Sequence, residues 1–168
     1  RMADPEIGPA PVLRDPANLV SPRARVVWRT GAAIRAMVPF AVALVLALTG
    51  VWDLPFWVWI LYVVIALSDV VLMPIYRYRV HRWETTATAV YTQTGWIARE
   101  RRIAPMSRVQ TVDLEQSVVG RVLGLATVTV TTASAAGPLR IEGLDLATAE
   151  RLVDDLTRRA EDEAGDAT

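Results

Sequence analysis

Two long apolar stretches, almost back to back in the first half of the chain, constrain its fold more than any other feature. The first covers residues 36–52 without a charge, and the second covers residues 54–76 with Asp69 as its one charge; only Asp53 separates them. A helix needs about 20 apolar residues to cross the hydrocarbon core of a bilayer. At about 1.5 Å per residue, these stretches would give helices of roughly 26 and 35 Å. The sequence therefore predicts a two-span membrane hairpin and disfavours a hairpin buried inside a soluble protein.

Arginine residues flank the two stretches on their outer sides and are missing from the turn between them. Those before the first stretch are Arg23, Arg25, Arg29 and Arg35, and those after the second are Arg77, Arg79 and Arg82. Because basic residues stay on the cytoplasmic side of a membrane, this distribution predicts a multi-pass protein of the cell (inner) membrane with both termini in the cytoplasm. The segment that starts at residue 21 is expected either to lie in the interface as a short helix or to extend the first span.

Asp69 is the one ionisable group set back from the membrane edge, roughly 12 Å along the helix from Arg77. A charged group inside a membrane is a functional candidate by default. In an antiparallel hairpin, however, Arg35 comes to about the same depth as Asp69. The sequence therefore favours a structural Arg35–Asp69 ion pair, and it leaves an ion or proton path open as the alternative.

The composition removes several kinds of chemistry from consideration. The chain has no cysteine and a single histidine, His81, which we expect on the surface. Disulfides, thiolate metal ligands and cysteine nucleophiles are excluded, and serine–histidine catalysis is poorly supplied. The formal net charge is zero, so the chain as a whole is not attracted to nucleic acid. We therefore expect no catalytic, cofactor or metal site.

The second half of the chain changes to a period of two, which is typical of strands. Strands are expected at residues 79–85, 89–94, 96–104, 109–116, 126–132 and 139–142. Gly143 is expected to end the sheet, and Asp145 to cap a final helix whose apolar stripe begins at Leu146. This outline is similar to a pleckstrin-homology-like (PH-like) barrel, in which a helix closes one open end of the sheet.

The predicted fold class is therefore an α+β membrane protein. A two-helix transmembrane hairpin precedes a PH-like antiparallel β-barrel or sandwich that is capped by a C-terminal α-helix. The expected division is a disordered, proline-rich tail, the interfacial segment with the hairpin, the cytoplasmic PH-like domain and a frayed acidic tail. These parts cover residues 1–20, 21–76, 77–160 and 161–168 in that order.

Two sequence elements carry a resemblance to a known family. Residues 103–112 read IAPMSRVQTV, and residues 116–128 combine Gln116 and Arg121 with the run LGLATV. With these elements, the domain resembles the bacterial pleckstrin-homology-like family of the membrane-anchored, YdbS-like type. The preceding hairpin also fits that family. The chain departs from the family pattern at residues 118–120, which read VVG and weaken the short helix expected there.

The polar residues of these elements allow two interpretations. They are Arg108, Gln110, Gln116 and Arg121, with Gly124 expected to supply a positive-φ bend. Arg108, Gln110 and Gln116 could clamp the short helical turn that Gln116 and Arg121 flank, or they could bind a phosphate or carboxylate with the same donors. We favour the structural clamp and keep ligand recognition as the alternative.

The resemblance implies a recognition module rather than an enzyme. Its leading interpretation is a non-enzymatic adaptor that assembles with a partner membrane protein carrying related PH-like domains, in envelope-stress or bacteriocin tolerance. The first alternative is an anionic-lipid-binding module that uses Arg77, Arg79, Arg82, Arg99, Arg101 and Arg102. The second is a small transport-complex subunit, and it depends on Asp69 alone.

Overall fold

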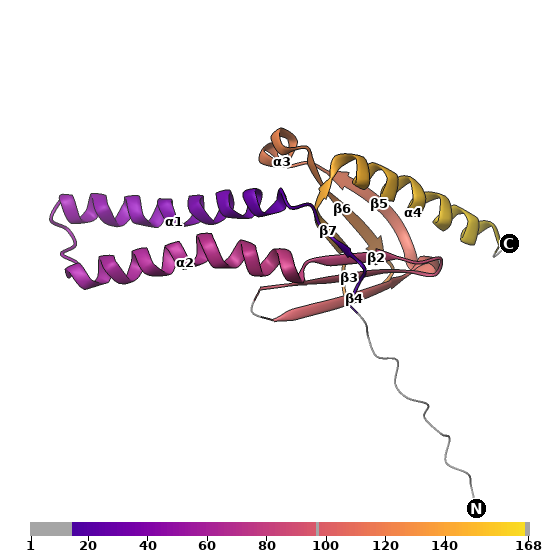
Figure 1. Cartoon of the computed structure of the whole chain (residues 1–168), viewed down its shortest axis with the longest axis horizontal. Helices are drawn as coiled ribbons and strands as arrows, with labels where there is room; N and C mark the ends of the chain where they lie inside the picture. Colours follow the sequence, from indigo (N-terminus) through magenta and orange to yellow (C-terminus); the bar gives the residue numbers. More distant parts are fainter. Residues whose placement is uncertain (1–14, 97, 167–168) are drawn as a thin grey trace, which may run out of the picture.

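The structure is a computed structural model that describes residues 15–96 and 98–166. Most of the predicted N-terminal tail, residues 1–14, and the last two residues of the acidic tail lie outside the described residues. A helical hairpin extends from one end of a β-rich domain (Figure 1). In chain order the elements are β1 (Asn18–Leu19), α1 (Ala24–Leu48), α2 (Phe56–Val80), β2 (Arg82–Thr85), β3 (Ala89–Gly95), β4 (Arg99–Pro105), the 3-10 turn η1 (Met106–Arg108), β5 (Val109–Glu115), α3 (Val118–Leu123), β6 (Leu125–Thr132), β7 (Leu139–Asp145) and α4 (Leu146–Asp166).

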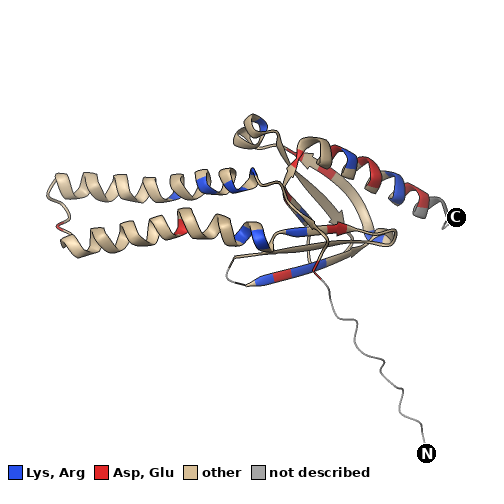
Figure 2. Cartoon of the chain, viewed as in Figure 1, with Lys and Arg blue, Asp and Glu red and all other residues tan. Residues whose placement is uncertain are grey.

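The hairpin has the length and surface of a membrane-spanning unit. Helices α1 and α2 are both long and apolar enough to cross a bilayer, and many of their large apolar side chains are exposed. In water such a surface would be unfavourable, whereas lipid tails would cover it. Figure 2 shows the charged residues of both helices confined to the half of the hairpin next to the domain. The membrane hairpin expected from the sequence is therefore present.

The helix limits differ from the expected spans in two ways. Helix α1 runs without a break from Ala24, so the segment before the first span is an extension of that span and not a separate helix. Helix α2 continues to Val80, so the strand expected from residue 79 begins only at Arg82. The last turn of α2 contains Arg77 and Arg79, and positive side chains are favourable at the negative end of a helix.

The domain is built from two antiparallel sheets and α4. One sheet has the strand order β1-β2-β3-β4, and the other has the order β5-β6-β7. Helix α4 packs on β5, β6 and η1 and covers the second sheet. The buried core joins Val90 of the first sheet, Val128 and Val130 of the second, and Ala149 and Leu156 of α4. The apolar stripe predicted for the final helix is therefore the part of α4 that enters the core.

Three details near the ends of the elements differ from expectation. The tail predicted over residues 1–20 includes β1, whose Asn18 and Leu19 pair with Trp83 and Arg82. The acidic tail predicted from residue 161 is helical up to Asp166. Gly143 does not end the sheet, because β7 passes through it with φ +76° beside a register shift in the β6–β7 pairing.

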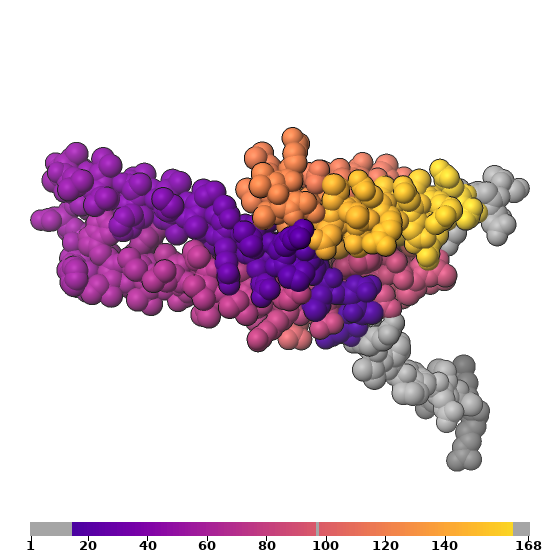
Figure 3. Space-filling view, turned by 45° about the horizontal axis from the view of Figure 1, so that its top comes forward, coloured from indigo at the N-terminus to yellow at the C-terminus, as the bar shows by residue number. Residues whose placement is uncertain are grey.

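The hairpin and the domain are joined by a second buried cluster. It contains Val20, Ala24, Trp28, Ala32 and Met73, and Trp83 contacts both this cluster and the domain core. Figure 3 shows the indigo start of α1 lying directly against the domain. The backbone N–H of Ser21 donates to the carbonyl of Gly143 at 2.8 Å, and the Ser21 hydroxyl donates to Asp145 at 2.9 Å.

Gly143 of β7 leaves the space that the start of α1 needs to pack against the domain. A Cβ atom at Gly143 would lie 2.6 Å from the Cβ of Ala24, closer than two such atoms approach in folded proteins. Gly137 is a matched control, because it also has φ +76° but has nothing within 4 Å of the same position.

We predict that Gly143→Ala destabilises the protein more than Gly137→Ala does. Both changes place a side chain in the left-handed region, which costs about 1–2 kcal/mol. Only Gly143→Ala adds an overlap with α1, and overpacking of this kind costs about 1–3 kcal/mol more. Denaturant unfolding in detergent micelles would measure both variants. Equal losses of unfolding free energy would show that the close approach to α1 is unimportant.

Candidate functional site

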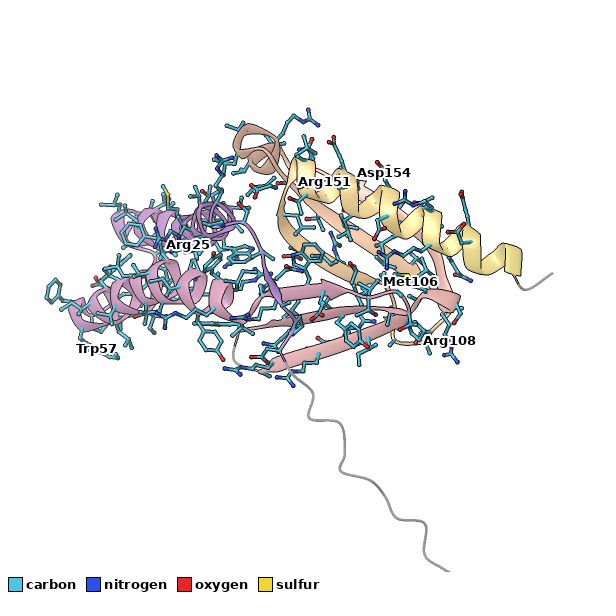
Figure 4. All side chains as sticks on the ribbon, turned by 45° about the vertical axis from the view of Figure 1, so that its right-hand side comes forward. Arg25, Trp57, Met106, Arg108, Arg151 and Asp154 are labelled. Atoms are coloured by element: carbon cyan, nitrogen blue, oxygen red, sulfur yellow. The ribbon has the colours of Figure 1, made fainter. Side chains whose placement is uncertain are left out.

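The five residues of the predicted recognition motif are divided between two ends of the domain. Gln116, Arg121 and Gly124 surround α3 near the hairpin, whereas Arg108 and Gln110 lie at the other end of β5. Figure 4 shows this separation, with Arg108 at the opposite end of the molecule from Trp57 of the hairpin. The motif is therefore not one ligand site.

Around α3, the polar residues hold the chain in place. The Gln116 side-chain amide donates to the carbonyl of Leu125 at 3.0 Å. Gln116 therefore clamps the turn as expected, whereas Arg108 and Gln110, which were expected to share this role, lie too far away at the other end of β5. Gly124 has φ +66° and forms the bend into β6, also as expected. Ser117 completes the arrangement by accepting from the backbone N–H of Gly120 at 3.0 Å. Ser117 was not among the predicted residues, although a serine just before a short helix is a recognisable N-cap.

A polar hollow of about 260 Å³ lies at the end of the domain remote from the hairpin. Its rim includes Arg102, Arg108 and Ser134. Arg102 donates to the carbonyls of Ala136 at 2.6 Å, Gly137 at 2.7 Å and Pro138 at 2.6 Å, and it thereby holds the turn between β6 and β7. Among the described residues, the exposed guanidinium of Arg108 has no hydrogen-bond or ion-pair partner.

The six arginines expected to face lipid do not form one surface. Arg77 pairs with Glu142 at 2.8 Å and lies over the ring of Trp28. Arg102 binds the β6–β7 turn, as described above. Two more of the six arginines make hydrogen bonds within the protein. Arg82 donates to the carbonyl of Pro16, and Arg101 donates to Gln93 and Asp15. In the described part of the chain, Arg79 and Arg99 are the two that keep exposed side chains without such bonds.

Arg35 and Asp69 approach each other at the depth expected for the hairpin, with 3.5 Å between the guanidinium and the carboxylate. They line a groove of about 550 Å³ that also includes Tyr62 and Trp96. Trp96 belongs to the connection between β3 and β4, and its ring packs against that of Tyr76 with 5.7 Å between centroids. A structural role for the Arg35–Asp69 pair stays a prediction.

His81 is buried, so the expectation of a surface position is wrong. It follows the end of α2 and is only 4% exposed, with its ring 5.0 Å from that of Trp28. Its Nδ1 atom lies 3.2 Å from the carbonyl oxygen of Arg77, where it can donate a hydrogen bond. Burial and, to a smaller extent, the charge of Arg77 lower the pKa of His81 to about 4, and the bond to the Arg77 carbonyl partly opposes this shift.

No group of three or more histidine, aspartate or glutamate side chains suited to a metal ion occurs within residues 15–96 and 98–166. The geometry around α3 is structural, and that of the remote hollow suits an anionic group.

Comparison with known proteins identifies the class of this chain. The family model of the bacterial PH domain matches residues 25–160. The UPF0699 transmembrane protein YdbS of Bacillus subtilis (strain 168) is 31% identical over an alignment of 153 residues, and the alignment covers 86% of this chain and 93% of that relative. No solved structure matches the chain. The chain belongs to the bacterial PH domain family and is a membrane-associated PH-like protein of the YdbS-like type.

We predict that the buried His81 makes the stability of the protein depend on pH. Its folded pKa of about 4 lies below the ordinary value of 6.5, so the unfolded chain binds more protons between these values. The full contribution is present above pH 6.5 and is lost as the pH falls towards 4. A pKa shift of this size corresponds to a loss of about 3 kcal/mol of unfolding free energy.

His81→Asn is the matched variant, because an asparagine amide can keep the bond to the Arg77 carbonyl without titrating. The unfolding free energy, measured in detergent micelles at a series of pH values, should fall more steeply with decreasing pH for the native chain than for His81→Asn. Parallel curves for the two proteins would contradict the assignment of this pH dependence to His81.

Proposed function

We propose that this protein is a non-enzymatic adaptor at the cytoplasmic face of the cell (inner) membrane, where its PH-like domain assembles with a partner membrane protein. The observation that carries the proposal is the hollow beside Arg108. It combines an exposed guanidinium without a partner among the described residues with a position remote from the membrane hairpin (Figure 4).

The position of Arg108 favours a protein partner over lipid of the same bilayer. The hairpin leaves the domain at one end, and the hollow lies at the other, so the headgroups around the hairpin are out of reach of Arg108. A carboxylate on an adjoining protein domain is the kind of group that a free guanidinium binds with good geometry.

The distribution of the other arginines weakens the lipid-binding alternative. Of the six residues expected to face lipid, four make internal contacts: Arg77 with Glu142, Arg82 and Arg101 with the segment before β1, and Arg102 with the β6–β7 turn. An anionic-lipid site built from all six would have to break these contacts. Only Arg79 and Arg99 fit a role at the membrane without rearrangement.

The arginines beside the spans support an orientation with both termini in the cytoplasm, because they lie at the domain end of the hairpin (Figure 2). A partner that carries related PH-like domains, and a role in envelope-stress or bacteriocin tolerance, complete the proposal. Both come from the family resemblance and not from the geometry of the hollow.

A photo-crosslinking experiment tests the proposal in native membranes. A photoreactive amino acid at Ser107, an exposed position next to Arg108, should give an adduct with a membrane protein that carries PH-like domains. Arg108→Gln should remove that adduct. Arg158→Gln should leave it intact, because Arg158 is a similarly exposed arginine on α4.

Two outcomes would contradict the adaptor role. One is the absence of any protein adduct at Ser107 while the protein is present in the membrane at normal levels. The other is an adduct that persists in Arg108→Gln, which would show that the free guanidinium does not contribute to assembly.

A further inference from the structure

The most exposed apolar side chains of the described residues lie on the short helix α3. Val118 is 82% exposed and Val122 is 83% exposed, values above those of the lipid-facing side chains of the hairpin. They are four residues apart and therefore lie on the same face of the helix. Val119 and Leu123 are half-buried against the domain. One face of α3 is thus packed on β6, and the other presents valine outward.

Helix α3 lies at the domain end of the hairpin. Figure 1 places it beside the domain end of α1, on the side of the domain that faces the hairpin. The same level holds the arginines of both membrane helices (Figure 2). A Cβ atom built at Gly124, which caps α3, would be 4.0 Å from the guanidinium of Arg23, just before α1. Arginines that flank a membrane span lie near the headgroups, so valines beside these arginines are placed to meet headgroups.

Arg121 adds a charge of the appropriate sign. It lies between the two valines in sequence, is exposed, and has no ion-pair partner in the described part of the chain. Two apolar side chains with a basic one between them form the pattern of segments that lie in the interface of a bilayer.

On the other side of the hairpin, the connection between β3 and β4 also lies beside a membrane helix. The ends of β3 and β4 reach towards α2 on the side opposite α3 (Figure 1), and Trp96 packs there against Tyr76. Tryptophan and tyrosine prefer the headgroup level of a membrane. The hairpin therefore has an interfacial segment of the domain on each side.

We propose that α3 is a membrane-contacting element, in which Val118 and Val122 enter the headgroup region of the bilayer that holds the hairpin and Arg121 lies among the lipid phosphates. This contact fixes the domain against the membrane at a point outside the hairpin. The proposal depends only on the anchoring of the hairpin in a membrane, and it is independent of the adaptor role. The bilayer is favoured over a protein as the occupant because α3 is held at headgroup level by the joint between α1 and β7.

Single-cysteine labelling of the full chain tests this proposal, since the native chain has no cysteine. Val118→Cys and Val122→Cys would carry an environment-sensitive fluorophore in vesicles of phosphatidylethanolamine and phosphatidylglycerol. Both probes should emit at shorter wavelength than the same fluorophore free in buffer. Their fluorescence intensity should fall when lipids with a headgroup spin label are included in the vesicles. Because both valines are so exposed, neither change should disturb folding.

Thr157→Cys is the matched control, an exposed position on the part of α4 that extends away from α3. Its probe should resemble a probe in water and should be insensitive to spin-labelled lipid. Arg121→Gln should reduce quenching at Val118→Cys in anionic vesicles, and it should have no effect in vesicles of phosphatidylcholine.

Three results would overturn the proposal. Probes at Val118→Cys and Val122→Cys that match the Thr157→Cys control would show that α3 stays in water. Emission at shorter wavelength in native membranes, but not in vesicles that contain no other protein, would assign the valines to a protein partner. An unchanged response in Arg121→Gln would remove the arginine from the contact.

Discussion

The close approach of α1 to β7 is the contact on which the rest of this structure depends. Ala24 lies so near Gly143 that no side chain fits between them, and the Ser21 N–H donates to the Gly143 carbonyl at 2.8 Å. Trp28 is held nearby between His81 and Arg77. These contacts are short and buried, so they fix the direction in which the hairpin leaves the domain. A flexible linker would leave that direction open.

A fixed hairpin gives the domain two different ends. At the membrane end lie α3, Trp96 and the arginines of the last turn of α2. At the far end lies the hollow beside Arg108. In a membrane, basic residues at the two ends would therefore have different partners available to them, lipid headgroups at one end and groups in the aqueous phase at the other. The predicted recognition motif is divided between these ends: Gln116 and Gly124 have structural roles at α3, and Arg121 and Arg108 are exposed at opposite ends of the domain.

The elements that the sequence predicted well are those with a strong local pattern. The two spans, the strands of the domain and the apolar stripe of α4 each repeat a simple spacing, and each is present. The clamp from Gln116 and the bend at Gly124 were also predictable, because their partners lie within a few residues.

The features that sequence reasoning missed depend on contacts between distant segments. β1 forms because Asn18 meets Trp83, and β7 passes through Gly143 because α1 lies against it. His81 is buried by Trp28 from another helix, so its position between basic residues misleadingly indicated exposure. The six arginines were grouped by charge alone, whereas their internal partners are far away in sequence, as Glu142 is from Arg77.

The central claim is a membrane hairpin that holds a PH-like domain on the cytoplasmic side, and site-directed thiol labelling in intact cells tests it most directly. Asp53 lies in the exposed turn between α1 and α2, and Ser107 is exposed at the far end of the domain. A membrane-impermeant thiol reagent should label Asp53→Cys in intact cells, and it should label Ser107→Cys only after the membrane is opened. Labelling of Ser107→Cys in intact cells, with Asp53→Cys protected, would contradict the account.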